Sequence, residues 1–293
     1  MIDIRGAWTA LVTPFRDGRV DEKALCELVE WQIASGIHGL VPCGTTGESV
    51  SLSADEHRRV IECVVQQTKG RVPVVAGAGT ASTQRSIELA QAAKSAGADG
   101  LLLVCPYYNR PTQAGLEAHF RALLKAVPLP AILYNVPGRT GCDLSPETLQ
   151  RLADLPQAVA IKEASGNVLR VQQLLRLFGD RYRILSGDDP NLLATLAVGG
   201  QGIVSVTSNL RPAEVARVIE YWWQGRHEES RALHYSLLPL HEALFVESNP
   251  GPIKAALALS KKIGEEIRLP LVWPSESTLQ LLRSILEAEK ENT

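Results

Sequence analysis

The feature that most restricts the fold of this chain is a short apolar run that recurs eight times, each time followed by a helical pattern. The runs read ALVTPF, HGLVPCG, VPVVAGAG, GLLLVCP, PAILYNVP, AVAIKEA, RILSGDD and GIVSV. Each run is too short and too continuously apolar for a half-exposed strand, which is typical of a buried parallel sheet.

The helical patterns between these runs carry start and stop signals. Ser53 with Glu56 three residues later forms a capping box, and Ser145 precedes a proline at the first helical position. The patterns predict helices that begin at Ser53 and Ser145, and helices over 21–35, 82–96, 112–126, 167–178, 190–198 and 212–223.

Strict alternation of strand and helix from Ala7 to about Gly225 favours parallel βα units. Eight units close a (β/α)8 TIM barrel, and a doubly wound sheet of eight strands is the alternative. Beyond Gly225 the pattern is helical only. We therefore expect an α/β fold with a catalytic barrel over 1–225 and a C-terminal helical extension over 226–293.

Composition limits the classes of function. A chain of 293 residues with 45% hydrophobic content can form one large core, and a net charge of −2 provides no broad basic surface for nucleic acid. The apolar runs are too short to cross a membrane, and the N-terminus lacks the pattern of a signal peptide. The sequence thus predicts a cytoplasmic protein that acts on small molecules, without membrane or nucleic-acid partners.

Two residue types that often bind metals give no such signal here. The five cysteines are scattered, without a CxxC pair, and are expected to be buried reduced thiols: Cys26, Cys43, Cys63, Cys105 and Cys142. His234 and His241 lie seven residues apart without a further ligand set, so packing or surface roles are favoured over a metal pair. GAGTAS, from Gly77 to Ser82, lacks the third glycine of a dinucleotide-binding loop.

In a TIM barrel the active site lies at the C-terminal ends of the strands, and polar residues gather there. GTTGES, PYYNRP, YNVPGRTG, IKEASGN and SGDD follow five of the predicted strands. Lys162 interrupts the apolar run AVAI, and burial at the barrel mouth would lower the pKa of its amine. A neutral amine can attack a carbonyl carbon. The alternatives are a lysine that extends to solvent or pairs with Glu163.

Other polar residues at the strand ends fit the same chemistry. Tyr134 could transfer protons beside the lysine, and Arg139 could bind a substrate carboxylate with two hydrogen bonds. The GTTGE loop could hold a carboxylate through backbone N–H groups. Tyr107 and Tyr108 could contact a ligand or a partner. Each of these features also has a purely structural alternative. Tyr134 could be a packing residue, Arg139 a solvated loop residue, the GTTGE run a tight turn with a helix cap, and the tyrosine pair part of a packed loop.

Together these motifs resemble the 4-hydroxy-tetrahydrodipicolinate synthase family, also called dihydrodipicolinate synthases, over nearly the whole chain. GTTGES, PYYNRP, YNVPGRTG, IKEASGN and GGQGIVSVTSN occur in the same order and at similar spacing. The resemblance implies a class I aldolase-type barrel that needs no cofactor or metal and condenses pyruvate with L-aspartate 4-semialdehyde in lysine and diaminopimelate biosynthesis. Such proteins are usually homotetramers built as a dimer of dimers, and a dimer is the alternative assembly.

The resemblance also implies roles for individual residues. Lys162 would form the imine with pyruvate, and Thr45, Tyr134 and Tyr108 would form a proton relay, with Tyr108 reaching into the neighbouring subunit. Thr45 and Thr46 would hold the pyruvate carboxylate and Arg139 that of the semialdehyde. The backbone of Gly187 and Val204 would line the pocket.

Family members that lysine inhibits carry an allosteric site, which this chain matches only in part. Ser49, His57 and Tyr107 correspond to residues of that site, but Ala81 and Arg85 stand where sensitive members tend to carry an asparagine and a glutamate. An arginine in place of the acid would repel the ammonium of lysine. We therefore expect weak or absent feedback inhibition.

Two other functions fit parts of this pattern. A pyruvate-dependent aldolase acting on 2-keto-3-deoxy acids would share the lysine and the tyrosine, but such enzymes usually lack the arginine of YNVPGRTG and the PYYNRP pair. A silent barrel that senses a small acid would not need a neutral amine beside a proton relay.

Overall fold

The structure, a computed structural model, describes residues 2–291. Eight parallel strands form one sheet in the order β4-β1-β10-β9-β8-β7-β6-β5. Their bounds are β1 Gly6–Ala10, β4 Gly39–Val41, β5 Val75–Gly77, β6 Gly100–Val104, β7 Ala131–Asn135, β8 Ala158–Glu163, β9 Arg183–Ser186 and β10 Gly202–Ser205. An isolated parallel bridge joins Leu40 to Val74, and the Gly77 N–H donates to the Pro42 carbonyl at 2.9 Å. The two ends of the sheet thus meet, which confirms the barrel.

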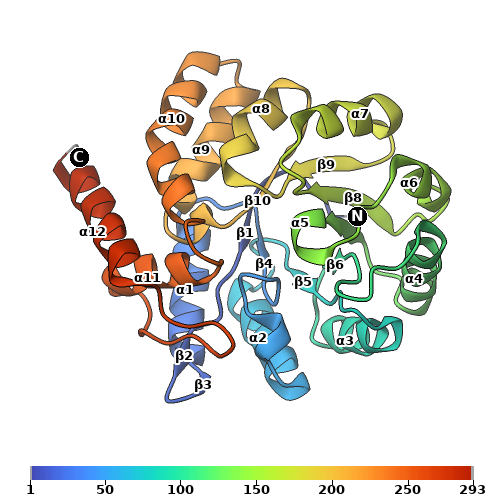
Figure 1. Cartoon of the computed structure of the whole chain (residues 1–293), viewed down its shortest axis with the longest axis horizontal. Helices are drawn as coiled ribbons and strands as arrows, with labels where there is room; N and C mark the ends of the chain where they lie inside the picture. Colours follow the sequence, from blue (N-terminus) through green and yellow to red (C-terminus); the bar gives the residue numbers. More distant parts are fainter. Residues whose placement is uncertain (1, 292–293) are drawn as a thin grey trace.

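Helices cover the outside of this barrel (Figure 1). They are α1 Glu22–Ala34, α2 Ala54–Thr68, α3 Thr83–Ser95, α4 Gln113–Ala126, α6 Pro146–Leu152, α7 Val168–Phe178, α8 Leu192–Ala197 and α9 Pro212–Trp223. The capping box at Ser53 is present, and Ser145 caps α6 through the N–H of Thr148. These polar side chains satisfy N–H groups that a helix start leaves without partners, which is why the predicted starts are accurate.

The first barrel strand lies earlier than the sequence predicts, because β1 ends at Ala10, where the run ALVTPF begins. Three further features differ from the helices and strands that the sequence predicts. The hairpin of β2 Phe15–Arg16 and β3 Arg19–Val20 and the one-turn helix α5 Pro137–Thr140 were not expected. The helix expected over 190–198 divides into a 3-10 turn, Asp189–Asn191, and α8. All three are shorter than the periodicity of a helix or strand can reveal. Two further 3-10 turns span Ser49–Ser51 and Thr207–Asn209.

The C-terminal extension consists of α10 His227–Ala243, α11 Gly251–Leu259 and α12 Glu276–Glu291. Figure 1 shows these helices, coloured orange to red, on one side of the barrel. α10 packs against α9 and α8, and α11 packs against α12 and the turn after β10. The extension therefore lies beside the strand ends that the sequence marks as the active-site end.

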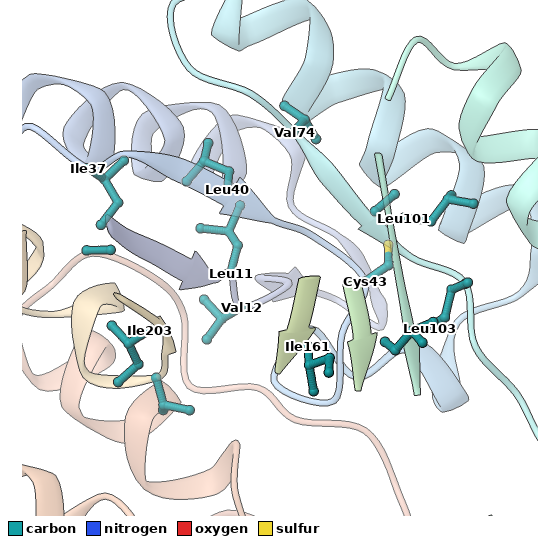
Figure 2. Close-up of a cluster of buried hydrophobic side chains, with 14 of the residues drawn as sticks. Leu11, Val12, Ile37, Leu40, Cys43, Val74, Leu101, Leu103, Ile161 and Ile203 are labelled. Atoms are coloured by element: carbon teal, nitrogen blue, oxygen red, sulfur yellow. The ribbon is translucent and has the colours of Figure 1, made fainter. Parts of the chain in front are cut away.

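The core has two layers, one inside the barrel and one between strands and helices. Trp8, Leu102, Ile132 and Leu185 fill the interior with other side chains, and a Cβ at Gly39 would lie 2.2 Å from the Trp8 ring. The outer layer includes the cluster in Figure 2, which shows Leu11, Val12, Ile37, Leu40, Cys43, Val74, Leu101, Leu103, Ile161 and Ile203. Because successive strand residues point to opposite faces, every strand supplies both layers.

Candidate active site

Lys162 lies near the C-terminal end of β8 and points into the barrel. Ala160 belongs to the interior cluster and Ile161 to the outer one, so alternation directs Lys162 inward, where 6% of its surface is exposed. Glu163 is directed outward, and its carboxylate accepts hydrogen bonds from the Ser165 N–H (2.7 Å) and from Asn135 Nδ2 (3.0 Å). Lys162 therefore neither extends to solvent nor depends on Glu163 as its partner.

Tyr134 is placed beside Lys162 by the register of the sheet. β7 and β8 are parallel, and Tyr134 pairs with Lys162 across the ladder. Lys162 Nζ lies 4.1 Å from the centroid of the Tyr134 ring. The phenol is hydrogen-bonded to the side chain of Thr45. The structure thus brings together three of the residues expected to carry the chemistry, from three different strand ends.

The environment shifts the pKa values of Lys162 and Tyr134 in opposite directions. Burial lowers the pKa of Lys162 to about 7; Asp189 opposes this shift and the Arg139 charge adds to it. Burial raises the pKa of Tyr134 to about 12, against the effects of Arg139 and of the hydrogen bond with Thr45. Near pH 7.5 the lysine is largely a neutral nucleophile and the tyrosine a protonated acid. This is the pair of protonation states that imine formation requires.

The GTTGE loop between β4 and α2 is held from outside the barrel. Thr45 is exposed to the cavity, whereas Thr46 is buried and accepts a hydrogen bond from Asn249 Nδ2 at 3.0 Å. Glu48 has a φ of +53°. Its carboxylate lies 2.5 Å from Lys254 Nζ, with both side chains buried, and also accepts from the Arg268 N–H at 3.0 Å. The C-terminal extension therefore supports the loop.

Two adjoining cavities open at this end of the barrel. The inner one has a volume of about 170 Å³ and is lined by Lys162, Gly187 and Thr46, among others. The outer one has a volume of about 440 Å³ and is lined by Glu48, Ser49, Tyr107 and Tyr108, among others. Both are lined by Gly44, Thr45, Leu102, Tyr134, Val136, Arg139 and Asn249. Such an arrangement has room for one small acid at the lysine and a second molecule outside it.

The other expected site residues vary in how close they lie to Lys162. Arg139, on α5, is exposed and lines both cavities. Tyr108 is 93% exposed with a φ of +70°, and the half-buried Tyr107 lies beside it. Gly187 touches the lysine directly, since a Cβ there would lie 2.8 Å from Lys162 Cε. Val204 is packed inside the barrel; on that segment Val206 lines the inner cavity instead.

Sequence reasoning missed several residues of the cavities. Asp188 and Phe245 line the inner cavity, and Asn249 lines both. Burial is the main cause that raises the pKa of the Asp188 carboxyl, and the neighbouring charge of Asp189 raises it further. Asp188 belongs to the SGDD motif at a strand end, so a signal existed. Asn249 and Phe245 come from the helical extension, where no strand end marks them.

The residues of the partly matched allosteric site lie on the outer side of the loop. Ser49 and Tyr107 line the outer cavity. His57 is buried on α2, with its Nε2 atom 2.7 Å from the Gly77 carbonyl oxygen; burial chiefly lowers its pKa, and the charge of Arg85 adds to the shift. Arg85, on α3, pairs with Glu88 at 3.1 Å. The positive charge of Arg85 therefore acts on His57.

Other polar groups outside these cavities have structural explanations. His234 and His241 are buried on α10, with ring centroids 5.5 Å apart, and His241 Nδ1 lies 2.7 Å from Thr207 Oγ1.

A cavity of about 620 Å³ lies at the opposite end of the barrel, around Arg181 and Tyr182, far along the strands from Lys162. Within residues 2–291, no helix is long and apolar enough to cross a membrane.

Comparison with known proteins links this geometry to one family. The model of the dihydrodipicolinate synthetase family matches residues 3–289. A 4-hydroxy-tetrahydrodipicolinate synthase of Nitratidesulfovibrio vulgaris (strain DP4) is 52% identical over 284 residues, covering 97% of each chain. The synthase structure from Methylacidiphilum fumariolicum SolV is 43% identical with a TM-score of 0.97, covering 99% of this chain and 97% of that one.

A third relative bears on the ligand. The dihydrodipicolinate synthase structure from Acinetobacter baumannii, described as chloride-inhibited and complexed with pyruvate, is 44% identical with a TM-score of 0.95. The match covers 97% of this chain and 98% of that one.

Proposed function

This chain belongs to the dihydrodipicolinate synthetase family, and we propose that it condenses pyruvate with L-aspartate 4-semialdehyde through an imine at Lys162. The observation that carries the proposal is the buried Lys162 amine, set 4.1 Å from the Tyr134 ring in a small cavity at the C-terminal end of the barrel. The product is 4-hydroxy-tetrahydrodipicolinate, with loss of one water, in lysine and diaminopimelate biosynthesis.

In the first half-reaction, the neutral Lys162 amine attacks the ketone carbon of pyruvate. Tyr134 donates a proton as the carbinolamine loses water, and Thr45, hydrogen-bonded to Tyr134, relays protons toward solvent. The N–H groups of the GTTGE loop and the Thr46 hydroxyl hold the pyruvate carboxylate. Loss of a methyl proton then gives an enamine, with the lysine nitrogen as the electron sink, so no cofactor or metal is required.

In the second half-reaction, the enamine carbon attacks the aldehyde in the outer part of the site. Arg139 binds the carboxylate of the semialdehyde, for which a planar guanidinium is well suited. The amine of the semialdehyde then attacks the imine carbon. Lys162 leaves as the ring closes, and the free enzyme is restored.

We also propose a homotetramer in which Tyr108 completes the site of the neighbouring subunit, and a cytoplasmic location. The support for the assembly is Tyr108 itself: its side chain is 93% exposed at the rim of the outer cavity and its backbone is left-handed. Left-handed backbone is unfavourable for tyrosine and persists where function or packing rewards it.

The test of the proposed reaction is sodium borohydride reduction with pyruvate, followed by peptide mass spectrometry, with turnover of L-aspartate 4-semialdehyde measured in parallel. We expect a reduced pyruvyl adduct on Lys162 alone, together with turnover. Lys162→Arg keeps the charge and removes the nucleophile, so it should lose the adduct.

The outcomes separate the parts of the proposal. An adduct without turnover of the semialdehyde would retain the imine mechanism and direct the search to another aldehyde, such as those of the sugar-acid aldolases. The absence of any adduct in the wild-type protein would overturn the assignment of Lys162.

A further inference from the structure

Four of the five cysteines lie in two thiol pairs. Cys26 on α1 and Cys63 on α2 have sulfur atoms 3.0 Å apart. The side chains of Cys105 and Cys142 are hydrogen-bonded to each other, and all these cysteines are free thiols. The second pair is of interest because neither residue takes part in the proposed reaction, yet both lie in segments that carry site residues.

The Cys105–Cys142 pair lies at the base of two segments of the active site. Cys105 follows β6 and precedes Tyr108 by three residues, and Cys142 follows Arg139 by three. Cys142 Sγ lies 3.2 Å from the Pro106 carbonyl oxygen. Arg110 Nε donates to the Gly141 carbonyl at 2.9 Å, so the segments also touch beyond the thiols. A covalent link here would join the Tyr108 segment to the Arg139 segment.

The two thiols have unequal surroundings. Cys105 is fully buried, whereas Cys142 is partly exposed. The hydrogen bond from Cys105 lowers the pKa of Cys142 to about 6, against the effect of burial, and the same contact raises the pKa of Cys105. The Pro106 carbonyl acts in the other direction, because it accepts a hydrogen bond only from protonated Cys142. Of the two, Cys142 is thus the thiol that a reagent reaches and the one that loses its proton more readily.

We propose that Cys142 and Cys105 are an oxidant-sensitive pair, in which a peroxide oxidises Cys142 and Cys105 converts the product into a disulfide between the two site segments. A partly exposed thiol beside a buried second thiol is the arrangement that favours this sequence of reactions.

The chemistry balances with one peroxide for each disulfide. The Cys142 thiolate attacks one oxygen of hydrogen peroxide, the O–O bond breaks, and hydroxide leaves and takes up a proton as water. The sulfur of Cys105 then attacks that of the Cys142 sulfenic acid. The S–O bond breaks as the S–S bond forms, and a second water leaves with the proton of Cys105. Two thiols lose two electrons, and the peroxide gains them.

The disulfide should change binding of the second substrate more than imine formation. A disulfide bond of about 2.05 Å is much shorter than a contact between two thiols, so the segments must move together. Arg139 and Tyr108 move with them, whereas Lys162 and Tyr134 stay in the strands. This consequence, unlike the disulfide itself, depends on the proposed function. We expect at least a tenfold rise in KM for L-aspartate 4-semialdehyde, with pyruvyl adduct formation within twofold of the reduced protein.

Peptide mapping tests the modification without any assay of activity. The protein is treated with hydrogen peroxide, blocked with iodoacetamide and digested with trypsin, which does not cut between Arg110 and Pro111. The expected product joins residues 95–121 to residues 140–151 and separates after reduction. In Cys105→Ser, dimedone should trap a sulfenic acid on Cys142. In Cys142→Ser, the peptide that contains Cys105 should show no oxidation by the peroxide.

The other thiol pair provides the matched control. A link between residues 24–58 and 60–69, assigned by fragmentation to Cys26 rather than Cys43, would report the pair Cys26 and Cys63, and formation of that link alone would overturn the proposal. So would oxidation of Cys142 no faster than that of Cys26. Cys26→Ser should retain the change in KM and its reversal by dithiothreitol. If the disulfide forms and KM for the semialdehyde is unaltered, the effect on the site is wrong although the modification stands.

Discussion

Lys162 shows how one buried position sets the working pH of an amine. At pH 8 a lysine with an ordinary pKa is neutral in about 0.3% of molecules, whereas one with a pKa of 7 is neutral in about 90%. Burial with nearby Arg139 lowers the pKa of Lys162 to about 7, and Asp189 limits the shift. The barrel interior thus gives the nucleophile about a 300-fold larger neutral fraction.

The pH dependence of imine formation follows from this value. The neutral amine is the reactive form, so its supply falls as pH drops through the lowered pKa of Lys162. We expect kcat/KM for pyruvate to rise with pH and to level off above an inflection near pH 7, as measured in steady-state kinetics and by the rate of borohydride trapping. An inflection near the ordinary lysine value of about 10 would contradict the role of burial.

Gly187 leaves the space that the Lys162 side chain occupies. A Cβ at this position would lie 2.8 Å from Lys162 Cε and 2.6 Å from Ala164 Cβ. We therefore expect Gly187→Ala to move the amine and to slow pyruvyl adduct formation about 100-fold. Gly264→Ala is the control, because its Cβ would meet no atom closer than 3.5 Å and Gly264 lines neither cavity. Equal rates for both variants would show that the lysine tolerates the displacement.

The residues that sequence reasoning identified are those whose polarity contradicts their surroundings. Lys162 and Tyr134 stand out because each directly follows an apolar run, AVAI and AIL respectively. Asn249 could not be identified in this way, since it precedes a helix of the extension among ordinary polar residues. Its contact with Thr46 spans 203 positions of the sequence, and only the folded chain reveals it.

Among the elements, α11 contacts the GTTGE loop through a buried ion pair. Lys254 on α11 and Glu48 in the GTTGE loop form an ion pair in which both side chains are buried. Lys254→Met would leave a buried carboxylate without its cation, which costs about 3–5 kcal/mol. We expect that loss in urea unfolding, together with a raised KM for pyruvate because Thr45 and Thr46 share the loop.

A double variant separates the charge from the packing. Glu48→Gln with Lys254→Met removes both charges and should recover much of the lost stability. Lys125→Met changes an exposed lysine on α4 and should leave both stability and KM within experimental error. A double variant as unstable as Lys254→Met would show that volume, not charge, holds the loop.

The regular elements were predictable because their causes are local. Seven of the eight predicted apolar runs contain a barrel strand, whereas the first, ALVTPF, shares only Ala10 with β1; α9 spans the expected 212–223. By contrast, α5 and the β2–β3 hairpin escaped because one turn of helix or two residues of strand have no period to detect. The way the extension packs was equally hidden, since amphipathic helices indicate that a face is buried but not against what.

At the scale of the whole molecule, the exposed Tyr108 predicts that sites are shared between subunits. Lys162→Ala and Tyr108→Phe each disable a different part of a shared site, so mixed oligomers contain some sites with both groups intact. We expect the two inactive variants to regain activity when they are unfolded and refolded together, as measured by semialdehyde turnover. No recovery, despite mixed oligomers detected by native mass spectrometry, would assign Tyr108 to its own subunit's site.

The charge around His57 predicts a weak response to lysine. In the lysine site that the family resemblance implies, Arg85 would stand where sensitive members carry an acid, and its charge acts on His57. A lysine titration of activity should show little inhibition below millimolar concentrations. The variant Arg85→Glu with Ala81→Asn should gain sensitivity. Strong inhibition of the wild-type protein at sub-millimolar lysine would refute this interpretation.

The parallel register that places Tyr134 beside Lys162 also divides the enzyme into parts that can change independently. The pair is fixed by the ladder of two neighbouring strands, whereas Arg139 stands on a single turn of helix outside the sheet. An engineer could therefore rebuild residues 137–141 to accept another aldehyde without disturbing the imine chemistry. Directed evolution toward new carbon–carbon bonds would best begin with libraries in that turn.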